Sequence, residues 1–187
     1  MISIGSILSN YSPCVTKYLG NPGWDVYPEL LVVYGTLSER QGNKIAAKRF
    51  NKEYLGLGDK IIKADVDVNE ADLKTKCLVL FGRPETNKIA QQFKDDFPIK
   101  FNGNKFTWQG VTYDKPTQGV AQIVENPNNP RSLVIMYSGL RAKTTQMFCD
   151  LYLYDASASY VIFEDDKESL RGEWEVDSGL VWKLLKY

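Results

Sequence analysis

Five polar or charged side chains lie just beyond the ends of apolar segments, where they are well placed to bind a ligand. The apolar segments end in Gly35-Thr36, Gly82-Arg83 and Ser138-Gly139. Glycine lets backbone N–H groups approach a bound molecule closely, and an arginine side chain can bind a carboxylate or phosphate through two parallel hydrogen bonds. We therefore take the following as candidate ligand-binding residues: Thr36, Arg83, Glu85, Asn87 and Ser138.

The glycines also have a purely structural interpretation, because the pattern around two of them is repeated. Gly35-Thr36 is followed after a loop by Asn43-Lys44-Ile45-Ala46, and Gly82-Arg83 is followed by Asn87-Lys88-Ile89-Ala90. Glycine allows tight turns, and asparagine side chains hydrogen-bond nearby backbone groups. On this interpretation the chain contains two similar strand–turn–helix units whose turns bind no ligand.

The amino-acid composition excludes several kinds of catalytic site. None of the 187 residues is a histidine, which rules out Ser-His-Asp and Cys-His nucleophiles and removes the commonest zinc ligand. The sequence also lacks GxSxG, GxGxxG and a Walker loop, and its aspartates at 65, 67 and 72 lack the glycine and glutamate of a calcium loop. We therefore predict no catalytic residue and no metal ligand, and the chain alone is not expected to be an enzyme.

The charge balance gives no sign of a polyanionic partner. Lysine and arginine together number 23, as do aspartate and glutamate, so no long-range positive field would attract nucleic acid. Apolar runs such as Leu30–Tyr34 are far shorter than the roughly 20 residues that span a bilayer. The N-terminus has no basic segment typical of a signal peptide. We therefore expect neither nucleic-acid binding nor membrane insertion.

The three cysteines show no metal-binding or redox spacing. Cys14, Cys77 and Cys149 lie far apart, and an odd number argues against a disulfide framework. Cys77 opens an apolar segment, and Cys149 lies in a segment with helical periodicity. We expect both to behave as small buried apolar side chains.

Apolar and periodic segments predict alternating strands and helices. Strands that are apolar on both faces, as in the middle of a parallel sheet, are expected at residues 30–34, 77–81 and 133–137. A shorter strand is expected at 60–65. Helical periodicity covers residues 39–57, 84–97 and about 143–154.

The segment 99–125 has a different pattern, and we expect it to be antiparallel. Asn102-Gly103 is typical of a tight hairpin turn, and 119–125 predicts another strand. Residues 126–130, Asn-Pro-Asn-Asn-Pro, are expected to form an irregular loop because proline cannot donate to a strand ladder. Strands are also expected at 160–163, 173–176 and 180–185.

This order of elements predicts a three-layer α/β sandwich. Its sheet would be mostly parallel and Rossmann- or flavodoxin-like, with an antiparallel hairpin insertion. Residues 1–29 contain many glycines, prolines and asparagines, so we expect a lead-in or linker segment there. Residues 30–187 would form a single domain, since this length can bury a sufficient core.

Several of these segments together resemble one family, the C-terminal α/β domain of large, often secreted bacterial α/β-hydrolases of the esterase and prolyl-peptidase type. The resemblance spans about residues 24–185 and is strongest at 77–87 and 126–139. It rests on the following segments: Val33-Tyr34-Gly35-Thr36, Asp65-Val66-Asp67-Val68, the stretch 78–87, Asn126-Pro127-Asn128-Asn129-Pro130 and Tyr137-Ser138-Gly139.

The resemblance implies an accessory, non-catalytic domain that acts in interaction or stabilisation. In that family the hydrolase triad belongs to a separate upstream domain, which would be the partner of this chain. This sequence has no GxSxG and no histidine, so no catalytic residue is carried over. The resemblance also implies a secreted or periplasmic location.

A flavodoxin-like cofactor domain is one alternative. Tyr34-Gly35-Thr36 with Gly42-Asn43 is similar to the flavodoxin phosphate loop, which would imply binding of FMN or another anion. Glu39 lies in this loop and would repel a phosphate, and Asn43 takes the place of a hydroxyl side chain.

A carbohydrate- or peptide-binding module is the other alternative. Aromatic rings often form such surfaces, although buried tryptophans are more often part of the core. The candidates are Trp24, Trp108, Trp174 and Trp182. At least two of them would have to be exposed and lie side by side.

Overall fold

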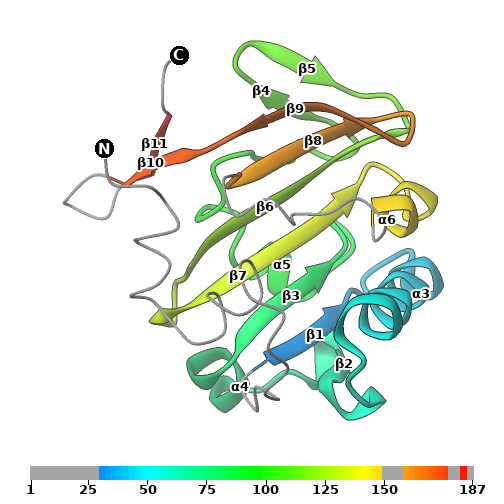
Figure 1. Ribbon diagram of the computed structural model, residues 1–187, viewed down its shortest axis with the longest axis vertical. Coiled ribbons are helices and arrows are strands. Elements are labelled where there is room, and N and C mark those ends of the chain that lie inside the picture. Colours follow the sequence, from blue (N-terminus) through cyan, green and yellow to red (C-terminus); the bar gives the residue numbers. More distant parts are fainter. Residues whose placement is uncertain (1–29, 149–157, 177–181, 185–187) are drawn as a thin grey trace.

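The strands that were predicted to be apolar on both faces lie inside a mixed sheet of seven strands. The computed structural model describes residues 30–148, 158–176 and 182–184. The sheet has the order β2-β1-β3-β7-β6-β8-β9 (Figure 1). Its strands are β1 (Leu30–Tyr34), β2 (Ile62–Ala64), β3 (Cys77–Phe81), β6 (Gln118–Asn126), β7 (Asn129–Gly139), β8 (Tyr160–Glu164) and β9 (Lys167–Gly172).

The sheet is parallel on one side and antiparallel on the other. The pairs β2–β1, β1–β3 and β3–β7 are parallel, whereas β6 is antiparallel to both β7 and β8, and β9 is antiparallel to β8. The α/β character of the fold is therefore confirmed, but the sheet is mixed and not mostly parallel as predicted. The prediction that 99–125 contains the antiparallel part is correct for β6, but antiparallel pairing continues beyond it to β9.

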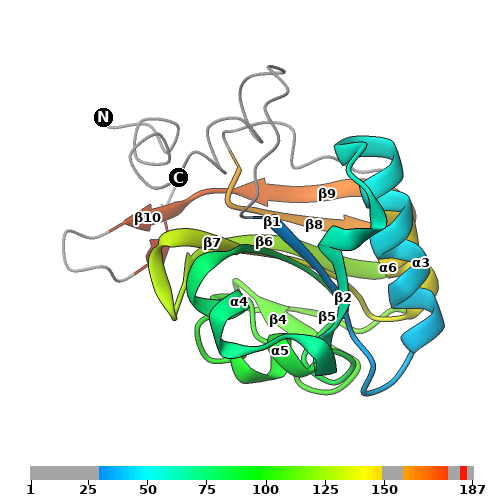
Figure 2. The same ribbon diagram turned by 90° about the horizontal axis from the view of Figure 1, so that it is seen from below.

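Helices pack on both faces of the parallel strands. The helices are α3 (Arg40–Phe50), which continues as a π-helical turn (η1, Asn51–Leu55), α4 (Glu70–Thr75), α5 (Lys88–Gln92) and α6 (Ala142–Phe148). Short 3-10 turns, η2 (Asp59–Ile61) and η3 (Asp65–Asp67), flank β2. Figure 2 shows α3 and α6 at one end of the sheet, with α4, α5 and the small hairpin below it.

Alternate residues of β1 belong to two different hydrophobic clusters, which explains why this strand lacks polar positions. Val32 packs with Ala46 and Phe50 of α3 on one face. Val33 packs with Ile89 and residues around α5 on the other face. Because both faces are covered, every residue of β1 and β3 is buried.

Helix α3 and its π-helical continuation η1 together match the predicted helix over 39–57, and α5 is shorter than predicted. The helical segment that begins at Arg40 ends at Gly56, which has the positive φ of 62° that terminates a helix easily. α5 ends at Gln92, because Phe93 leaves helical geometry with φ −98° and ψ 12°. Residues 93–97 keep their buried phenylalanines but form turns, so the predicted helix over 84–97 is only partly correct.

The small hairpin turns later than predicted. β4 (Phe106–Trp108) pairs with β5 (Val111–Tyr113) in a separate two-stranded sheet. Gln109 and Gly110 both have positive φ, 50° and 81°, as a tight hairpin turn of the primed type requires. At the predicted turn around Gly103 only an isolated bridge forms, between residues 101 and 106. The hairpin packs through Phe106 and Trp108 on the sheet.

The predicted irregular loop at 126–130 is wrong. Strands β6 and β7 are joined there by a tight connection in which Asn126 pairs with Asn129. The buried side chain of Asn126 accepts a hydrogen bond from the Asn128 N–H and donates one to the Leu73 carbonyl. These side-chain hydrogen bonds pair backbone groups that make no hydrogen bond between the two strands.

Of the C-terminal strands, β8, β10 and β11 agree with prediction where they are described, whereas β9 was not predicted. β10 (Trp174–Val176) pairs antiparallel with β11 (Trp182–Leu184). The predicted helix at 143–154 is confirmed through Phe148, and its remainder lies outside the described residues, as does the predicted lead-in segment 1–29.

Cys77 corrects the prediction made for the cysteines. It is buried, as expected, but it is disulfide-bonded. The other two cysteines, Cys14 and Cys149, both lie outside the described residues. The odd number of cysteines therefore does not prevent one disulfide from forming.

Asp72 ties α4 to β2 and makes the stability depend on pH. Its carboxylate accepts hydrogen bonds from the Lys63 ammonium group at 2.7 Å and from the Asn69 N–H at 3.1 Å. Burial acts to raise the pKa of Asp72, but these hydrogen bonds and the charges of Lys63 and Lys76 hold it below its ordinary value. Because its pKa is lower in the folded state, the Asp72 carboxylate stabilises that state above about pH 4. This stabilisation is lost as the pH falls through the folded-state pKa.

We predict that Asp72→Asn lowers the free energy of unfolding by about 1 kcal/mol at pH 7, since it removes a partly buried charge pair. The difference from the parent protein should become smaller as the pH falls from 7 toward 2, because Asp72 becomes protonated. Urea unfolding at both pH values measures this. Asp95→Asn is the matched control, because Asp95 is 81% exposed; a difference for Asp72→Asn that is as large at pH 2 as at pH 7 would contradict the prediction.

Candidate functional site

The candidate site lies where the connections from two neighbouring strands diverge. From β1 the chain passes through α3 to β2 on one side, whereas from β3 it passes through α5, the hairpin and β6 to β7 on the other side. In α/β sheets, ligands bind at such a switch point beyond the carboxyl ends of the strands. Here that position is occupied by side chains of the chain itself.

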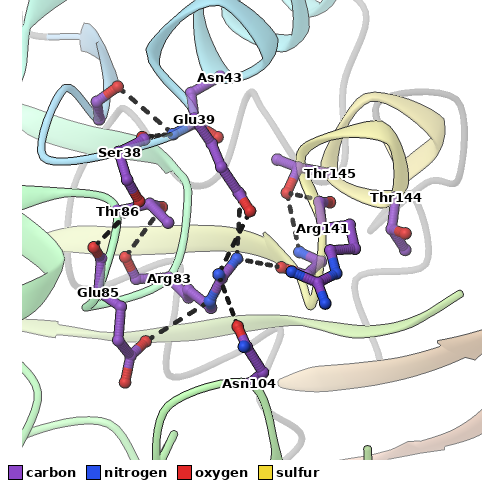
Figure 3. A network of polar contacts seen from close by, with 12 residues as sticks. Ser38, Glu39, Asn43, Arg83, Glu85, Thr86, Asn104, Arg141, Thr144 and Thr145 are labelled. Carbon is purple, nitrogen blue, oxygen red and sulfur yellow. Dashed lines mark hydrogen bonds and ion pairs between the residues drawn. The ribbon is translucent and has the colours of Figure 1, made fainter. Parts of the chain in front are cut away.

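Arg83 is at the centre of these side chains (Figure 3). It is 5% exposed. Its two terminal nitrogens donate to the two carboxylate oxygens of Glu39, at 3.0 and 3.3 Å. The same nitrogens also donate to the Gly139 carbonyl at 3.3 Å and to the Asn104 side chain at 2.9 Å. The guanidinium group therefore already makes with Glu39 the two-hydrogen-bond contact that was predicted for the carboxylate or phosphate of a ligand.

Glu39 reaches Arg83 because of its position before α3. It is the N-cap residue and has a left-handed conformation, with φ 54° and ψ 23°. Its side chain makes no capping hydrogen bond to the helix, and points instead toward Arg83 (Figure 3). The residue that we expected to repel a phosphate thus neutralises the arginine of the candidate site.

Glu85 approaches the same arginine from the other side. One oxygen accepts a hydrogen bond from the Gly103 N–H at 3.0 Å. The other lies 3.7 Å from Nε of Arg83, too far for a direct hydrogen bond. Neither this oxygen nor Arg83 Nε has a hydrogen-bond partner among the described residues. The Ser38 hydroxyl, from the loop after β1, donates to the Glu85 carbonyl.

Thr36 belongs to a second polar cluster, which is built around Asp65. Asp65 immediately follows β2 and is fully buried. Its carboxylate accepts hydrogen bonds from the N–H and the hydroxyl of Thr36 and from the Lys88 N–H. The backbone amides after β1 and at the start of α5, which a bound anion would otherwise use, therefore bind this carboxylate.

The repeated Asn-Lys-Ile-Ala pattern is explained by two equivalent hydrogen bonds. The Asn43 side chain donates to the carbonyl of Gly35, just after β1, at 3.3 Å. The Asn87 side chain donates to the carbonyl of Phe81, at the end of β3, at 3.1 Å, and its oxygen accepts from the first amides of α5. Each asparagine therefore fixes a helix to the end of the preceding strand, which agrees with the structural interpretation of the repeat.

The other predicted residues, Ser138 and Trp108, make no described polar contact with Thr36, Arg83, Glu85 or Asn87. Ser138 is fully buried, and its hydroxyl makes no hydrogen bond to any described residue. Trp108 is 8% exposed and packs against Tyr160 with ring centroids 5.1 Å apart. Trp24 lies outside the described residues. The structure thus brings together Arg83 and Glu85, but places Thr36 in the Asp65 cluster and uses Asn87 as a helix cap.

Three residues of this site were not predicted as part of it: Glu39, Asp65 and Asn104. The carboxyl-end rule that selected Thr36 and Arg83 also applies to Asp65, since Asp65 follows β2 directly. Asn104 had no comparable signal, because it reaches Arg83 from a loop 21 residues away. Among the described residues, no group of three acidic or cysteine side chains is arranged to hold a metal ion.

Comparison with protein-family models and with curated proteins finds no match to this chain. None of the helices in residues 30–148, 158–176 and 182–184 has both the length and the apolar character needed to cross a bilayer.

Proposed function

We propose that this chain is an accessory, non-catalytic α/β domain of an exported hydrolase-like protein, with a role in interaction or stabilisation. The observation that carries the proposal is that both terminal nitrogens of Arg83 are already paired, with Glu39, Asn104 and the Gly139 carbonyl. A binding arginine would be expected to keep a face open for its ligand. Here the strand ends are joined to one another, and this use of polar residues favours rigidity over binding.

The composition supports the same proposal. With no histidine in the sequence, the common general base of hydrolases is absent. In the polar contacts described above, no serine or cysteine side chain donates a hydrogen bond to the carboxylate of Glu39 or Glu85. The reaction of the parent protein would then belong to an upstream catalytic domain, and this chain would contact or support it.

The packing of helices supports the finer classification of the fold. α3 covers one face of β1 and β3, and α5 covers the other. We propose a three-layer, Rossmann- or flavodoxin-like arrangement for this half of the sheet, with β6, β8 and β9 as an antiparallel extension. Export is supported by the disulfide of Cys77, since disulfides persist mainly in oxidising compartments.

Two measurements test the proposal. The purified chain, incubated with short-chain acyl esters and with prolyl anilides, should hydrolyse them no faster than buffer does. Hydrolysis at enzymic rates that is lost on Arg83→Met would overturn the non-catalytic assignment. The gene upstream of the Met1 codon should encode, in frame, a domain with a GxSxG motif; an in-frame stop codon with no such domain would overturn the hydrolase association.

The buried cation at the switch point is the one observation that favours the flavodoxin-like alternative. Titration with FMN and with inorganic phosphate distinguishes the two functions. For the accessory domain we expect no rise in Tm and no yellow complex. A Tm that rises with FMN, and that no longer does so in Arg83→Met, would support anion binding in place of the accessory role.

A further inference from the structure

We propose that Asn102 is a site of spontaneous deamidation, and that the carboxylate of Glu85 slows this modification by binding the N–H of the next residue, Gly103. Asn102-Gly103 is the only Asn-Gly pair in the 187 residues, and the hairpin predicted around it forms elsewhere. The proposed function gives this pair no role, and the inference does not depend on that function. It rests on the contacts that Gly103 makes in the folded chain.

The surroundings of Asn102 and Gly103 leave room for an attack of the Gly103 nitrogen on the Asn102 side chain. Both residues are exposed, so water reaches them. Glycine has no Cβ that would hinder the approach of its nitrogen. Nothing lies within 4 Å of the position that a Cβ of Gly103 would take. Asparagine is also among the residue types that are lost most readily on heating.

Deamidation exchanges bonds at the Asn102 side chain. The backbone nitrogen of Gly103 gives up its proton and forms a bond to Cγ of Asn102. The bond between Cγ and Nδ2 breaks, and Nδ2 leaves as ammonia with that proton. Water then opens the resulting succinimide ring at either of its carbonyl groups, which leaves aspartate or isoaspartate at position 102. No oxidant or reductant takes part.

The nitrogen that would attack is already hydrogen-bonded in the folded chain. The Gly103 N–H donates to one carboxylate oxygen of Glu85 at 3.0 Å. The other oxygen of Glu85 lies 3.7 Å from Nε of Arg83, and the Arg83 side chain is only 5% exposed. The attraction of this buried cation holds the carboxylate against Gly103. Since hydrogen bonds to an ionised acceptor are the strong ones, breaking this bond adds to the barrier for the attack.

The charge of Glu85 acts in the same direction as the hydrogen bond. When the Gly103 nitrogen loses its proton, negative charge develops 3.0 Å from a carboxylate oxygen. Like charges at this separation repel each other. A glutamate side chain, with an ordinary pKa of about 4, is too weak a base to take the proton of a backbone amide. Glu85 therefore hinders the reaction and does not assist it.

The modification would occur next to the contacts that hold the strand ends. The Asn104 side chain accepts a hydrogen bond from Arg83 at 2.9 Å (Figure 3). The Asn102 N–H donates to the Lys105 carbonyl at 2.8 Å, so the loop is fixed on both sides of Gly103. Isoaspartate at position 102 would add a carbon atom to the backbone of this loop, together with a negative charge.

Rates of deamidation in the full 187-residue chain test the proposal. The parent protein, Glu85→Ala and Glu85→Gln are incubated in mildly alkaline buffer, and the peptide that contains Asn102 is followed by mass spectrometry. Glu85→Ala should deamidate about tenfold faster than the parent protein, since a hydrogen bond to a charged group is lost. Glu85→Gln keeps an acceptor without the charge, so its rate should lie between the two. A rate in Glu85→Ala equal to or below that of the parent protein would overturn the proposal.

Two controls separate the Glu85 contact from a general loss of stability. Leu73→Ala removes a buried side chain of α4 and lowers the stability of the whole domain, but it changes neither Glu85 nor Gly103. Its rate should match that of the parent protein. In concentrated urea, where the contact is absent, all variants should deamidate at one rate. Acceleration of Leu73→Ala to the rate of Glu85→Ala, or a difference for Glu85→Ala that persists in urea, would show the proposal to be wrong. Neither result touches the accessory function, which the hydrolysis assay tests.

Discussion

Arg83→Met is expected to lower the free energy of unfolding by about 3 kcal/mol, at the low end for a buried ion pair, because it leaves a partly buried carboxylate without its cation. Arg83 is 5% exposed, and the Glu39 side chain that it binds is 21% exposed. The substitution also removes donors from the Gly139 carbonyl and from Asn104. Equilibrium unfolding in urea, followed by circular dichroism, measures the loss.

Two further variants separate the charge effect from a simple loss of packing. Arg83→Met combined with Glu39→Gln should recover part of the stability, since no uncompensated charge then remains at this position. Arg49→Met removes the cation of an exposed ion pair with Glu53 and should change stability by less than about 1 kcal/mol. If Arg83→Met is as stable as the parent protein, the hydrogen bonds of Arg83 do not hold the strand ends together.

Gly35→Ala is expected to destabilise the protein by about 3 kcal/mol or more, because there is no space for a Cβ atom. A Cβ at Gly35 would lie 2.2 Å from the carbonyl oxygen of Thr86 and 2.7 Å from Cα of Asn87. Both neighbours are backbone atoms of the connection after β3, so a change of rotamer cannot relieve the contact. Urea unfolding again provides the measurement.

Gly58→Ala is the matched control for this substitution. Gly58 has a φ of −61°, which alanine adopts without strain, and nothing lies within 4 Å of an added Cβ. We expect this variant to be unchanged or more stable by up to about 1 kcal/mol, since alanine reduces the entropy of the unfolded chain. Equal effects of the two substitutions would show that the close approach at Gly35 does not matter.

Arg83→Met and Gly35→Ala both act where the loop after β1 meets the loop after β3. Gly35 donates its N–H to the Phe81 carbonyl at 3.0 Å, and Leu37 donates to the Thr86 carbonyl at 3.1 Å. The two loops therefore bond each other directly, and the hydrogen bonds of Arg83 add to these contacts.

The strands could be predicted from the sequence because their signals are local. Runs such as Leu78–Phe81 are apolar on both faces, and only a covered strand fits that pattern. The turns were harder to predict, since their conformations depend on hydrogen bonds between residues far apart in the sequence. Asn126 makes a tight connection at a proline-rich sequence because its side chain binds Leu73, 53 residues away.

The position of Arg83 beyond the end of β3 could be predicted from the sequence, but its contacts could not. The rule for strand ends selected Arg83 correctly as a residue of the switch point. Its partner Glu39 lies 44 residues away in sequence, and no spacing rule pairs them. The sequence also could not distinguish an arginine that is free to bind a ligand from one that is paired with a glutamate of the same chain.

The outer strand β9 limits how this domain can contact other proteins. It is the last strand on the antiparallel side of the described sheet, and its exposed positions include Lys167, Glu168 and Arg171. Charges on an edge strand oppose the addition of a strand from another molecule, which is how many β-sheet proteins avoid aggregation. A partner that approaches this edge would therefore be recognised through side chains, and the sheet would not extend across the contact.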